Sequence, residues 1–237
     1  MADTATEREA VVAALHNVAE RIEDEREYLT ELDSAIGDAD HGANLSRGFG
    51  AAVGEVEEMD EPSPQEVVQT VGMALISEVG GAAGPLYGGG AMAASEELAD
   101  GVTAETTVAF AEATLDSVQD RGDATVGQKT MVDALVPAVH TYRKSIEQDD
   151  LPPLAALAKA VAACERGVAF TLPIRAEKGR ASYLDWRSVG HQDPGATSTL
   201  FVMEEILETA REYVESDTDV AVDAAAPTTP EGVQENR

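Results

Sequence analysis

The chain has 237 residues, 45 acidic and only 16 basic side chains, and a formal net charge of −29 at pH 7. A chain of this length can bury a sizeable core, but its charge excludes a basic groove for nucleic acid and disfavours an anionic membrane surface as a partner. The single cysteine, Cys164, excludes an internal disulfide framework and a cysteine-based zinc site.

The acidic residues are spread along the chain, and only four of the sixteen cations are lysines. An acidic, lysine-poor and alanine-rich composition is typical of proteins adapted to concentrated salt, where screening weakens self-repulsion. An ordinary acidic protein is the alternative. The amino-terminal residues lack the basic and apolar regions of a signal peptide, and no run of about 20 apolar residues could span a bilayer. We therefore expect a cytoplasmic protein of halophilic character.

Hydrophobic periodicity and capping signals predict an all-α chain without strands. The first helix has capping-box spacing at Thr6 and Glu9, and the sequence Ser63-Pro64-Gln65-Glu66 provides an N-cap, a first-turn proline and a capping-box glutamate for the third helix. The predicted helices cover residues 6–33, 44–59, 64–78, 91–99, 106–119, 129–147, 153–169 and 196–214.

Three stretches between these helices are rich in Gly, Asp or Arg and are predicted as loops: residues 36–44, 80–90 and 172–194. Loops of that length in a compact helical domain are usually functional. From residue 215 the chain turns to small and acidic residues. We therefore predict one helical domain at 1–214 and a disordered acidic tail at 215–237.

The first loop region places Asp33, Asp38 and Asp40 within eight residues. Carboxylates this close repel one another unless a hard cation neutralises them, and oxygen ligands suit Mg²⁺ or Ca²⁺. The spacing does not fit an EF-hand. The residues alone leave a second interpretation open, in which Asp33 caps a turn and the other two carboxylates are solvated.

The other loops favour an anionic ligand without being specific for one. The stretch 80–90 has the glycines that let backbone N–H groups approach phosphate oxygens, although a close helix–helix turn is the better interpretation of these residues by themselves. Residues 175–187 hold four of the sixteen cations, which suggests an anion or a set of ion pairs. A fourth stretch, 122–131, places Gly, Lys and Thr before a helix and is weak by itself. Together the loops supply the parts for phosphoryl transfer.

Long strings in these loops resemble the L subunit of dihydroxyacetone kinase. They are LDSAIGDADHG at 32–42, VGGAAGPL at 79–86, KTM at 129–131, KGRASYL at 178–184 and GHQDPGATS at 190–198. The resemblance covers residues 8–212 in order. It implies a barrel or bundle of about eight antiparallel helices with the nucleotide site at one end.

By this resemblance, Asp33, Asp38 and Asp40 coordinate two Mg²⁺ ions, and Arg180 offsets charge on the transferring phosphoryl group. One departure is Ala83, because the family often has Ser there, and a hydroxyl contact to the nucleotide is lost. The resemblance places the ADP or ATP contacts at His41, Gly42, Ala43, Asn44, Ala82, Ala83, Gly122, Met131, Arg180, Asp193, Pro194 and Gly195.

The resemblance also implies partners. Dihydroxyacetone is held by a separate K subunit, and in the phosphotransferase-dependent type a phosphohistidine M subunit recharges ADP that stays bound to the L subunit. The lone L-like chain and its Asp-Ala-Asp-His-Gly loop are similar to that type. The alternatives are a subunit of an ATP-dependent dihydroxyacetone kinase and a nucleotide-sensing regulatory module. The sequence does not decide whether the chain forms a homodimer.

Overall fold

The computed structural model describes residues 4–213, which form nine α-helices and three short helical turns and contain no strand. The predicted tail at 215–237 and the last residue of the predicted domain lie outside the described residues. The helices are α1 (Thr4–Asp24), α2 (Arg26–Ile36), α3 (His41–Glu57), α4 (Pro64–Glu78), α5 (Gly89–Ser95), α6 (Ala104–Gly122), α7 (Val132–Glu147), α8 (Pro153–Thr171) and α9 (Pro194–Tyr213).

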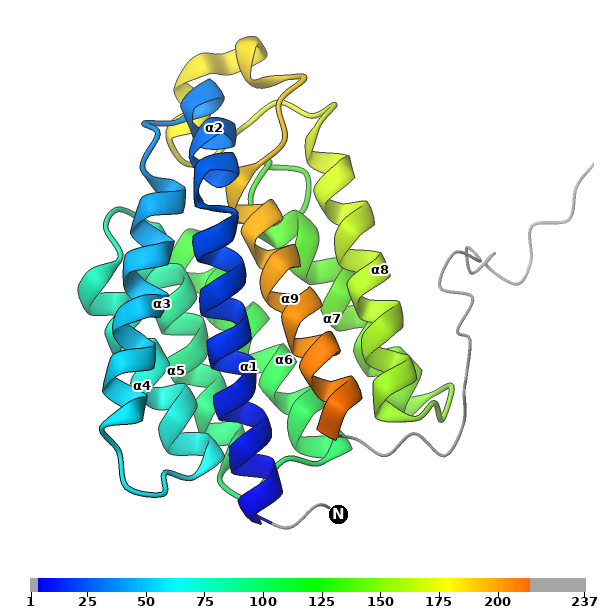
Figure 1. The fold of residues 1–237 in the computed structure, drawn as a ribbon. Coiled ribbons are helices and arrows are strands. Elements are labelled where there is room, and N and C mark those ends of the chain that lie inside the picture. Colours follow the sequence, from blue (N-terminus) through cyan, green and yellow to red (C-terminus); the bar gives the residue numbers. More distant parts are fainter. Residues whose placement is uncertain (1–3, 214–237) are drawn as a thin grey trace, which may run out of the picture.

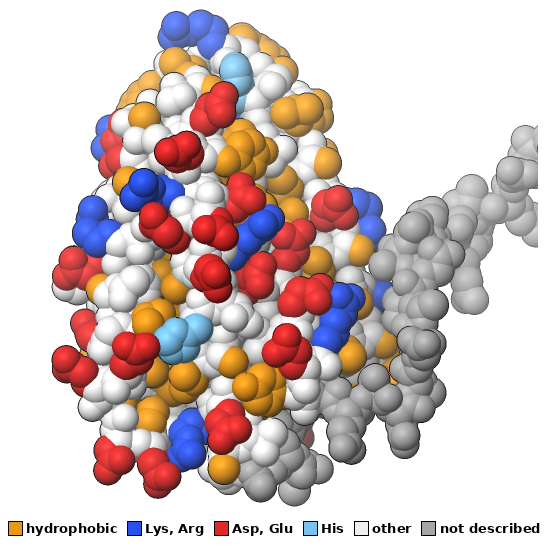
Figure 2. All heavy atoms as spheres, in the orientation of Figure 1, with side chains coloured by type: hydrophobic (Ala, Val, Ile, Leu, Met, Phe, Trp, Pro, Cys, Tyr) orange, Lys and Arg blue, Asp and Glu red, His pale blue; other side chains and the backbone are white. Residues whose placement is uncertain are grey.

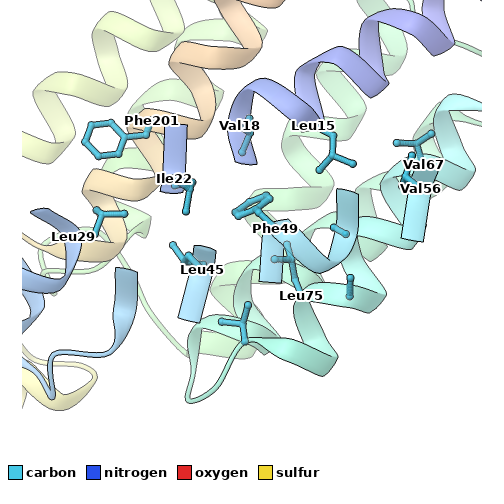
Figure 3. Close-up of a cluster of buried hydrophobic side chains, with 13 residues drawn as sticks. Leu15, Val18, Ile22, Leu29, Leu45, Phe49, Val56, Val67, Leu75 and Phe201 are labelled. Atoms are coloured by element: carbon cyan, nitrogen blue, oxygen red, sulfur yellow. The ribbon is translucent and has the colours of Figure 1, made fainter. Parts of the chain in front are cut away.

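The long helices stand side by side as an upright bundle, with α1 and α9 adjacent on the face seen in Figure 1. The largest buried cluster lies between α1, α3 and α4 and includes Ile22, Leu45 and Leu75 (Figure 3). Phe201 on α9 joins this cluster, so the first and last helices share one core. The bundle agrees with the predicted all-α fold, and its rigid packing holds the loops at its ends.

The predicted first helix is wrong in one respect, because the structure divides it into α1 and α2 at Glu25. The backbone at Glu25 has ψ of 8°, which interrupts the regular helix. Helix α2 then continues three residues past Asp33, so that this carboxylate lies in a helical last turn and not in a loop. Helix α3 begins at His41, earlier than the predicted start at Asn44.

The glycine-rich stretch 80–90 was predicted as a loop, but most of it is helical. A single π-turn, η1 (Gly84–Gly88), runs directly into α5, and a 3₁₀ turn, η2 (Glu96–Leu98), follows. Glycines are needed in this helical stretch because its backbone packs closely against α4 and the residue that follows α4. A Cβ on Gly84 would lie 2.3 Å from the Val79 carbonyl oxygen, and one on Gly88 would lie 2.5 Å from that of Gly72.

One of the two predicted helix caps is confirmed and the other is not. Ser63 and Glu66 form the predicted capping box at the start of α4, whereas α1 is already helical at Thr4, before the predicted cap at Thr6. Helix α7 starts at Val132, three residues later than predicted, because residues 123–131 form an irregular turn. The predicted loop 172–194 contains 3₁₀ turns, η3 (Arg180–Ser188).

Among the charged side chains on the face seen in Figure 2, acidic ones predominate, with fewer Lys and Arg side chains between them. They are scattered over several helices and do not gather in one patch on this face. None of the described helices is both long enough and apolar enough to cross a membrane.

Candidate functional site

A cleft opens at the end of the bundle where α2 ends and α3 and α9 begin. The segment 172–193, which joins α8 to α9 and includes η3, lies over this end and forms part of the rim (Figure 1). The stretch 80–83 after α4 and the residues before α7 complete the walls. All three loop regions that the sequence singled out therefore meet at one site.

The three aspartates come together in the cleft. One carboxylate oxygen from each of Asp33, Asp38 and Asp40 lies within 4.8 Å of the others. Asp33 is buried, whereas Asp38 and Asp40 are exposed. Three convergent carboxylates at this spacing fit a hard divalent cation, because Mg²⁺ prefers carboxylate oxygens and retains several waters.

Backbone amides hold the buried carboxylate in place. The Oδ2 atom of Asp33 accepts hydrogen bonds from the backbone N–H of Asp40 at 2.9 Å and of His41 at 3.2 Å. Gly37 makes room for the other oxygen, because a Cβ at this position would lie 1.9 Å from Asp33 Oδ1. The chain between Asp33 and His41 is thus folded around one carboxylate.

Arg180 reaches across the mouth of the cleft to this cluster. Its Nη2 lies 2.9 Å from Oδ2 of Asp38, and its side chain is 64% exposed. An exposed pair of this kind adds little to stability. The guanidinium is therefore free to exchange the carboxylate for another anion in the cleft.

Two helix amino termini face the cleft, at His41 of α3 and Pro194 of α9. The first-turn N–H groups of a helix have no acceptor within the helix and attract anions. Asp193 caps α9 by accepting the N–H of Ala196 at 2.8 Å, and burial raises the pKa of its carboxyl group to about 7. In these turns the His41 N–H already donates to Asp33, Pro194 has no N–H, and the Ala196 N–H donates to Asp193. The N–H of Gly195, which lines the cleft, is the first-turn group that suits a phosphate, and Asp193 is the buried acid beside it.

A buried polar network joins α3, η1 and α9 beneath the cleft. Nε2 of His41 lies 2.8 Å from Oγ of Ser198, which lies 2.7 Å from the hydroxyl of Tyr87. Burial lowers the pKa of His41 and raises that of Tyr87 to about 12. The imidazole is thereby engaged with α9, and its role in the cleft is to join the two helices.

The cations of the predicted basic loop divide into two groups. Arg175 pairs with Asp185 at 2.6 Å and with Glu177 at 3.3 Å, within the same segment. Lys178 pairs with Asp123 at 2.8 Å but also lines the cleft, as Arg180 does. Ion pairs therefore account for Arg175, whereas Lys178 and Arg180 remain candidates to bind an anionic ligand.

Most of the predicted contact residues line the cleft, and three described ones do not: Gly42, Ala43 and Gly122. Gly42 instead lets α3 pack on α2, because a Cβ there would lie 2.1 Å from the Arg26 carbonyl oxygen. The predicted residues that do line the cleft are Asp33, Asp38, Asp40, His41, Asn44, Ala82, Ala83, Met131, Arg180, Asp193, Pro194 and Gly195.

Sequence reasoning gave no role to two residues that the structure places in the cleft wall, Tyr87 and Lys129. Tyr87 stands among glycines in a stretch predicted to be a loop, and nothing local indicates that its hydroxyl meets α9. Lys129 belongs to the KTM string, but a lone lysine before a helix is normally exposed. Its burial depends on contacts with residues 42 or more positions away.

Comparisons with known proteins show the family of the chain. The DAK2 domain family matches residues 35–208. The Escherichia coli PEP-dependent dihydroxyacetone kinase, ADP-binding subunit DhaL, is 42% identical over 190 residues, which cover 79% of this chain and 90% of that protein. The Lactococcus lactis PTS-dependent dihydroxyacetone kinase, ADP-binding subunit DhaL, is 39% identical and covers 80% and 91%.

Among solved structures, the dihydroxyacetone kinase of C. freundii superposes with a TM-score of 0.65 at 23% identity, over 84% of this chain. At this identity the likeness shows a shared fold, and the chain spans about a third of that kinase, 34% of its length. The match to the family over most of the chain, together with the identity to full-length subunits, shows that the chain belongs to the DAK2 domain family, alongside the ADP-binding subunits of PEP-dependent dihydroxyacetone kinases.

Proposed function

We propose that the chain is the nucleotide-binding subunit of a dihydroxyacetone kinase. In this role it takes a phosphoryl group from a phosphohistidine donor subunit by way of bound ADP, and it delivers that group to dihydroxyacetone on a separate K subunit. The observation that carries the proposal is the cluster of three aspartates facing Arg180 where two helices begin. The names of the relatives supply the substrate class.

The residues present suit the proposed ligands. Asp33, Asp38 and Asp40 would hold two Mg²⁺ ions, which neutralise phosphate charge when bound. The backbone N–H of Gly195, in the first turn of α9, would donate to a phosphate oxygen. Met131, which is apolar and adaptable, would contact the base, beside Gly195, whose added Cβ would lie 3.6 Å from Met131 Cβ.

The chain's own contribution to phosphoryl transfer would be positioning and charge. Such reactions depend on alignment and electrostatic stabilisation more than on covalent chemistry by the protein. Arg180 is exposed enough to leave Asp38 and meet a phosphoryl oxygen. The imidazole of His41 is engaged with Ser198 and buried, and so would orient the α3 terminus rather than accept a phosphoryl group.

The donor is proposed to be a phosphohistidine protein because the full-length relatives carry PEP- or PTS-dependent names. A subunit of an ATP-dependent kinase is the second candidate, favoured by the shared fold with the C. freundii dihydroxyacetone kinase, one structure of which holds AMP-PNP and Mg²⁺. The two differ in turnover, because only the second sustains phosphorylation when ATP and a K subunit are supplied alone.

Nucleotide content tests the proposal directly. Protein purified in high salt with Mg²⁺ is denatured and the released nucleotide is quantified by chromatography. About one ADP per chain is expected, and Asp38→Ala should lose it, whereas Asp116→Ala, which changes an exposed aspartate on α6, should retain it. Protein that copurifies with no nucleotide and binds none on addition of ADP and Mg²⁺ would contradict the assignment.

The K subunit would dock at the open end of the cleft, because the acceptor must reach the bound phosphate. The rim there carries two strongly exposed aromatic side chains, Tyr183 at 86% and Trp186 at 72%. Exposed aromatics are enriched where proteins bind one another. Trp186→Ala should weaken binding of the K subunit in pull-down and calorimetry and leave ADP content unchanged, whereas full retention of K-subunit binding in Tyr183→Ala/Trp186→Ala would exclude this face.

A further inference from the structure

We propose that Lys129 is a positioning residue that fastens both ends of the segment 172–193 and so holds Arg180 at the mouth of the cleft. The inference that Lys129 fixes the segment rests only on the contacts of Lys129. The consequence for nucleotide binding rests on the proposed function.

Lys129 is 1% exposed and is the largest of the fully buried side chains among the described residues. Its Nζ donates to the carbonyl oxygens of Thr171 at 2.6 Å and Ile174 at 3.4 Å, and to that of His191. An ammonium group has three protons, so these carbonyls use its full donor capacity. A lysine this buried is rare unless such partners replace its water.

The turn before α7 is built to deliver this side chain. Asp133, itself buried, accepts the N–H of Gly127 at 2.5 Å and of Thr130 at 2.8 Å. The turn forces Lys129 into the left-handed region at φ of 61°. A non-glycine residue is strained in that region, so the surrounding hydrogen bonds must maintain the conformation.

The three carbonyls lie at the two ends of one segment. Thr171 ends α8 and Ile174 follows it, whereas His191 lies just before α9. One ammonium group therefore joins the point where the chain leaves the bundle to the point where it returns. Between these points lie Lys178 and Arg180, the two cations at the cleft.

The other side-chain ion pairs between this segment and the bundle are more exposed, and a small buried apolar cluster of Ile36 on α2 with Ala176 and Ala181 also joins the two. Arg180–Asp38 and Lys178–Asp123 are pairs with at least one exposed partner, and the N–H of Glu177 donates to the carbonyl of Gln128 at 3.1 Å. Exposed ion pairs contribute little. The buried lysine is thus the strongest polar side-chain constraint on the two ends of the segment.

Charge explains why a lysine suits this position. Burial lowers the pKa of Lys129, and the nearby carboxylates of Asp193 and Asp133 oppose that shift. Asp193 is attached to the same framework, because its N–H donates to Oγ1 of Thr171 at 3.0 Å. The cation therefore also sits beside the acid that caps α9.

The test uses Lys129→Met, which keeps a long unbranched side chain and removes the donors. Hydrogen exchange followed by mass spectrometry should show about tenfold faster exchange in peptides from 172–193, because the free energy needed to open this segment from the bundle is then lower. Helices α1 and α4 should be unaffected. The matched control is Lys144→Met, an exposed lysine on α7. Unchanged exchange in 172–193, or a uniform rise across the bundle, would overturn the proposal.

A double-mutant cycle links the segment to the ligand. Lys129→Met should raise the Kd for ADP with Mg²⁺ about tenfold if about a tenth of the molecules keep the segment closed. In an Arg180→Ala background the same change should cost much less, because it acts through that arginine. Equal effects in both backgrounds would refute positioning of Arg180, whereas a wild-type chain that binds no nucleotide would refute the proposed function and leave the exchange result standing.

If Lys129→Met fails to fold, a measurement on the wild-type chain still tests the proposal. Acylation by acetic anhydride, read by mass spectrometry, compares the rates at the chain's lysines. Lys129 should react about a hundredfold more slowly than Lys144, since its amine is released only when the segment opens. Reaction of the two lysines at similar rates in the folded protein would show that Lys129 does not hold the segment.

Discussion

Gly37→Ala tests whether the buried carboxylate of Asp33 organises the proposed metal site. The added Cβ would lie 1.9 Å from Asp33 Oδ1, whereas ordinary contact begins at 3.4 Å. The carboxylate must therefore move by about 1.5 Å, the difference between these distances.

The displacement breaks the contacts that fix Asp33. The hydrogen bonds from the N–H groups of Asp40 and His41, at 2.9 and 3.2 Å, cannot both survive a shift of that size. Each bond to a charged group is worth about 1.5–3 kcal/mol. With partial rehydration of the carboxylate, we expect a loss of about 2–3 kcal/mol, or about 30- to 150-fold weaker Mg²⁺-dependent ADP binding.

Titration calorimetry of ADP at several Mg²⁺ concentrations measures this loss. Gly54→Ala is the matched control, since a Cβ there meets nothing within 4 Å on an exposed part of α3. It should leave binding unchanged and raise the free energy of unfolding by up to about 1 kcal/mol through helix propensity. Wild-type affinity and wild-type Mg²⁺ dependence in Gly37→Ala would refute the role given to Asp33.

Three further predictions concern pH, affinity and salt. Because burial raises the pKa of Asp193 to about 7, protonation of this carboxyl group stabilises the fold as pH falls through 7. In the wild type this adds about 2–3 kcal/mol to the free energy of unfolding between pH 8 and 5, and Asp193→Asn should lose that gain. Denaturant titration without metal measures it, and an unchanged gain in the variant would exclude the raised pKa of Asp193. Ala83→Ser should tighten ADP binding by about one hydrogen bond, or about 1 kcal/mol in calorimetry, and weaker or equal binding would refute the lost-hydroxyl account. With a net charge of −29, the chain should unfold at higher temperature in molar KCl than in dilute buffer, and equal transition temperatures would exclude salt adaptation.

The sequence predicted the helices well because their signals are local. The capping box at Ser63 and Glu66 uses neighbouring residues, and it appears as predicted. The three aspartates were also within reach, since they lie within eight residues and a short loop has to bring them together. Arg180, by contrast, was placed opposite them by the family resemblance and not by any spacing in the chain.

What local patterns miss are contacts between distant segments. His41 and Ser198 lie 157 residues apart in the chain and 2.8 Å apart in the structure. Lys129 has an ordinary context before a helix, and its acceptors are the carbonyl oxygens of distant residues, Thr171, Ile174 and His191. Such polar groups become buried through tertiary packing, which hydrophobic periodicity does not encode.

Glycine shows why composition alone is ambiguous. The stretch 80–90 suggested either a phosphate loop or a close helix turn. In the structure Gly84 and Gly88 have backbone atoms within 2.3 and 2.5 Å of where a Cβ would be, as a close turn requires, and residues 80–83 line the cleft. Close packing at Gly88 thus holds the π-turn against α4, and that turn directs Tyr87 to α9. The helix-packing glycines therefore support the cleft without lining it, and a substitution at Gly88 would disturb the cleft through Tyr87.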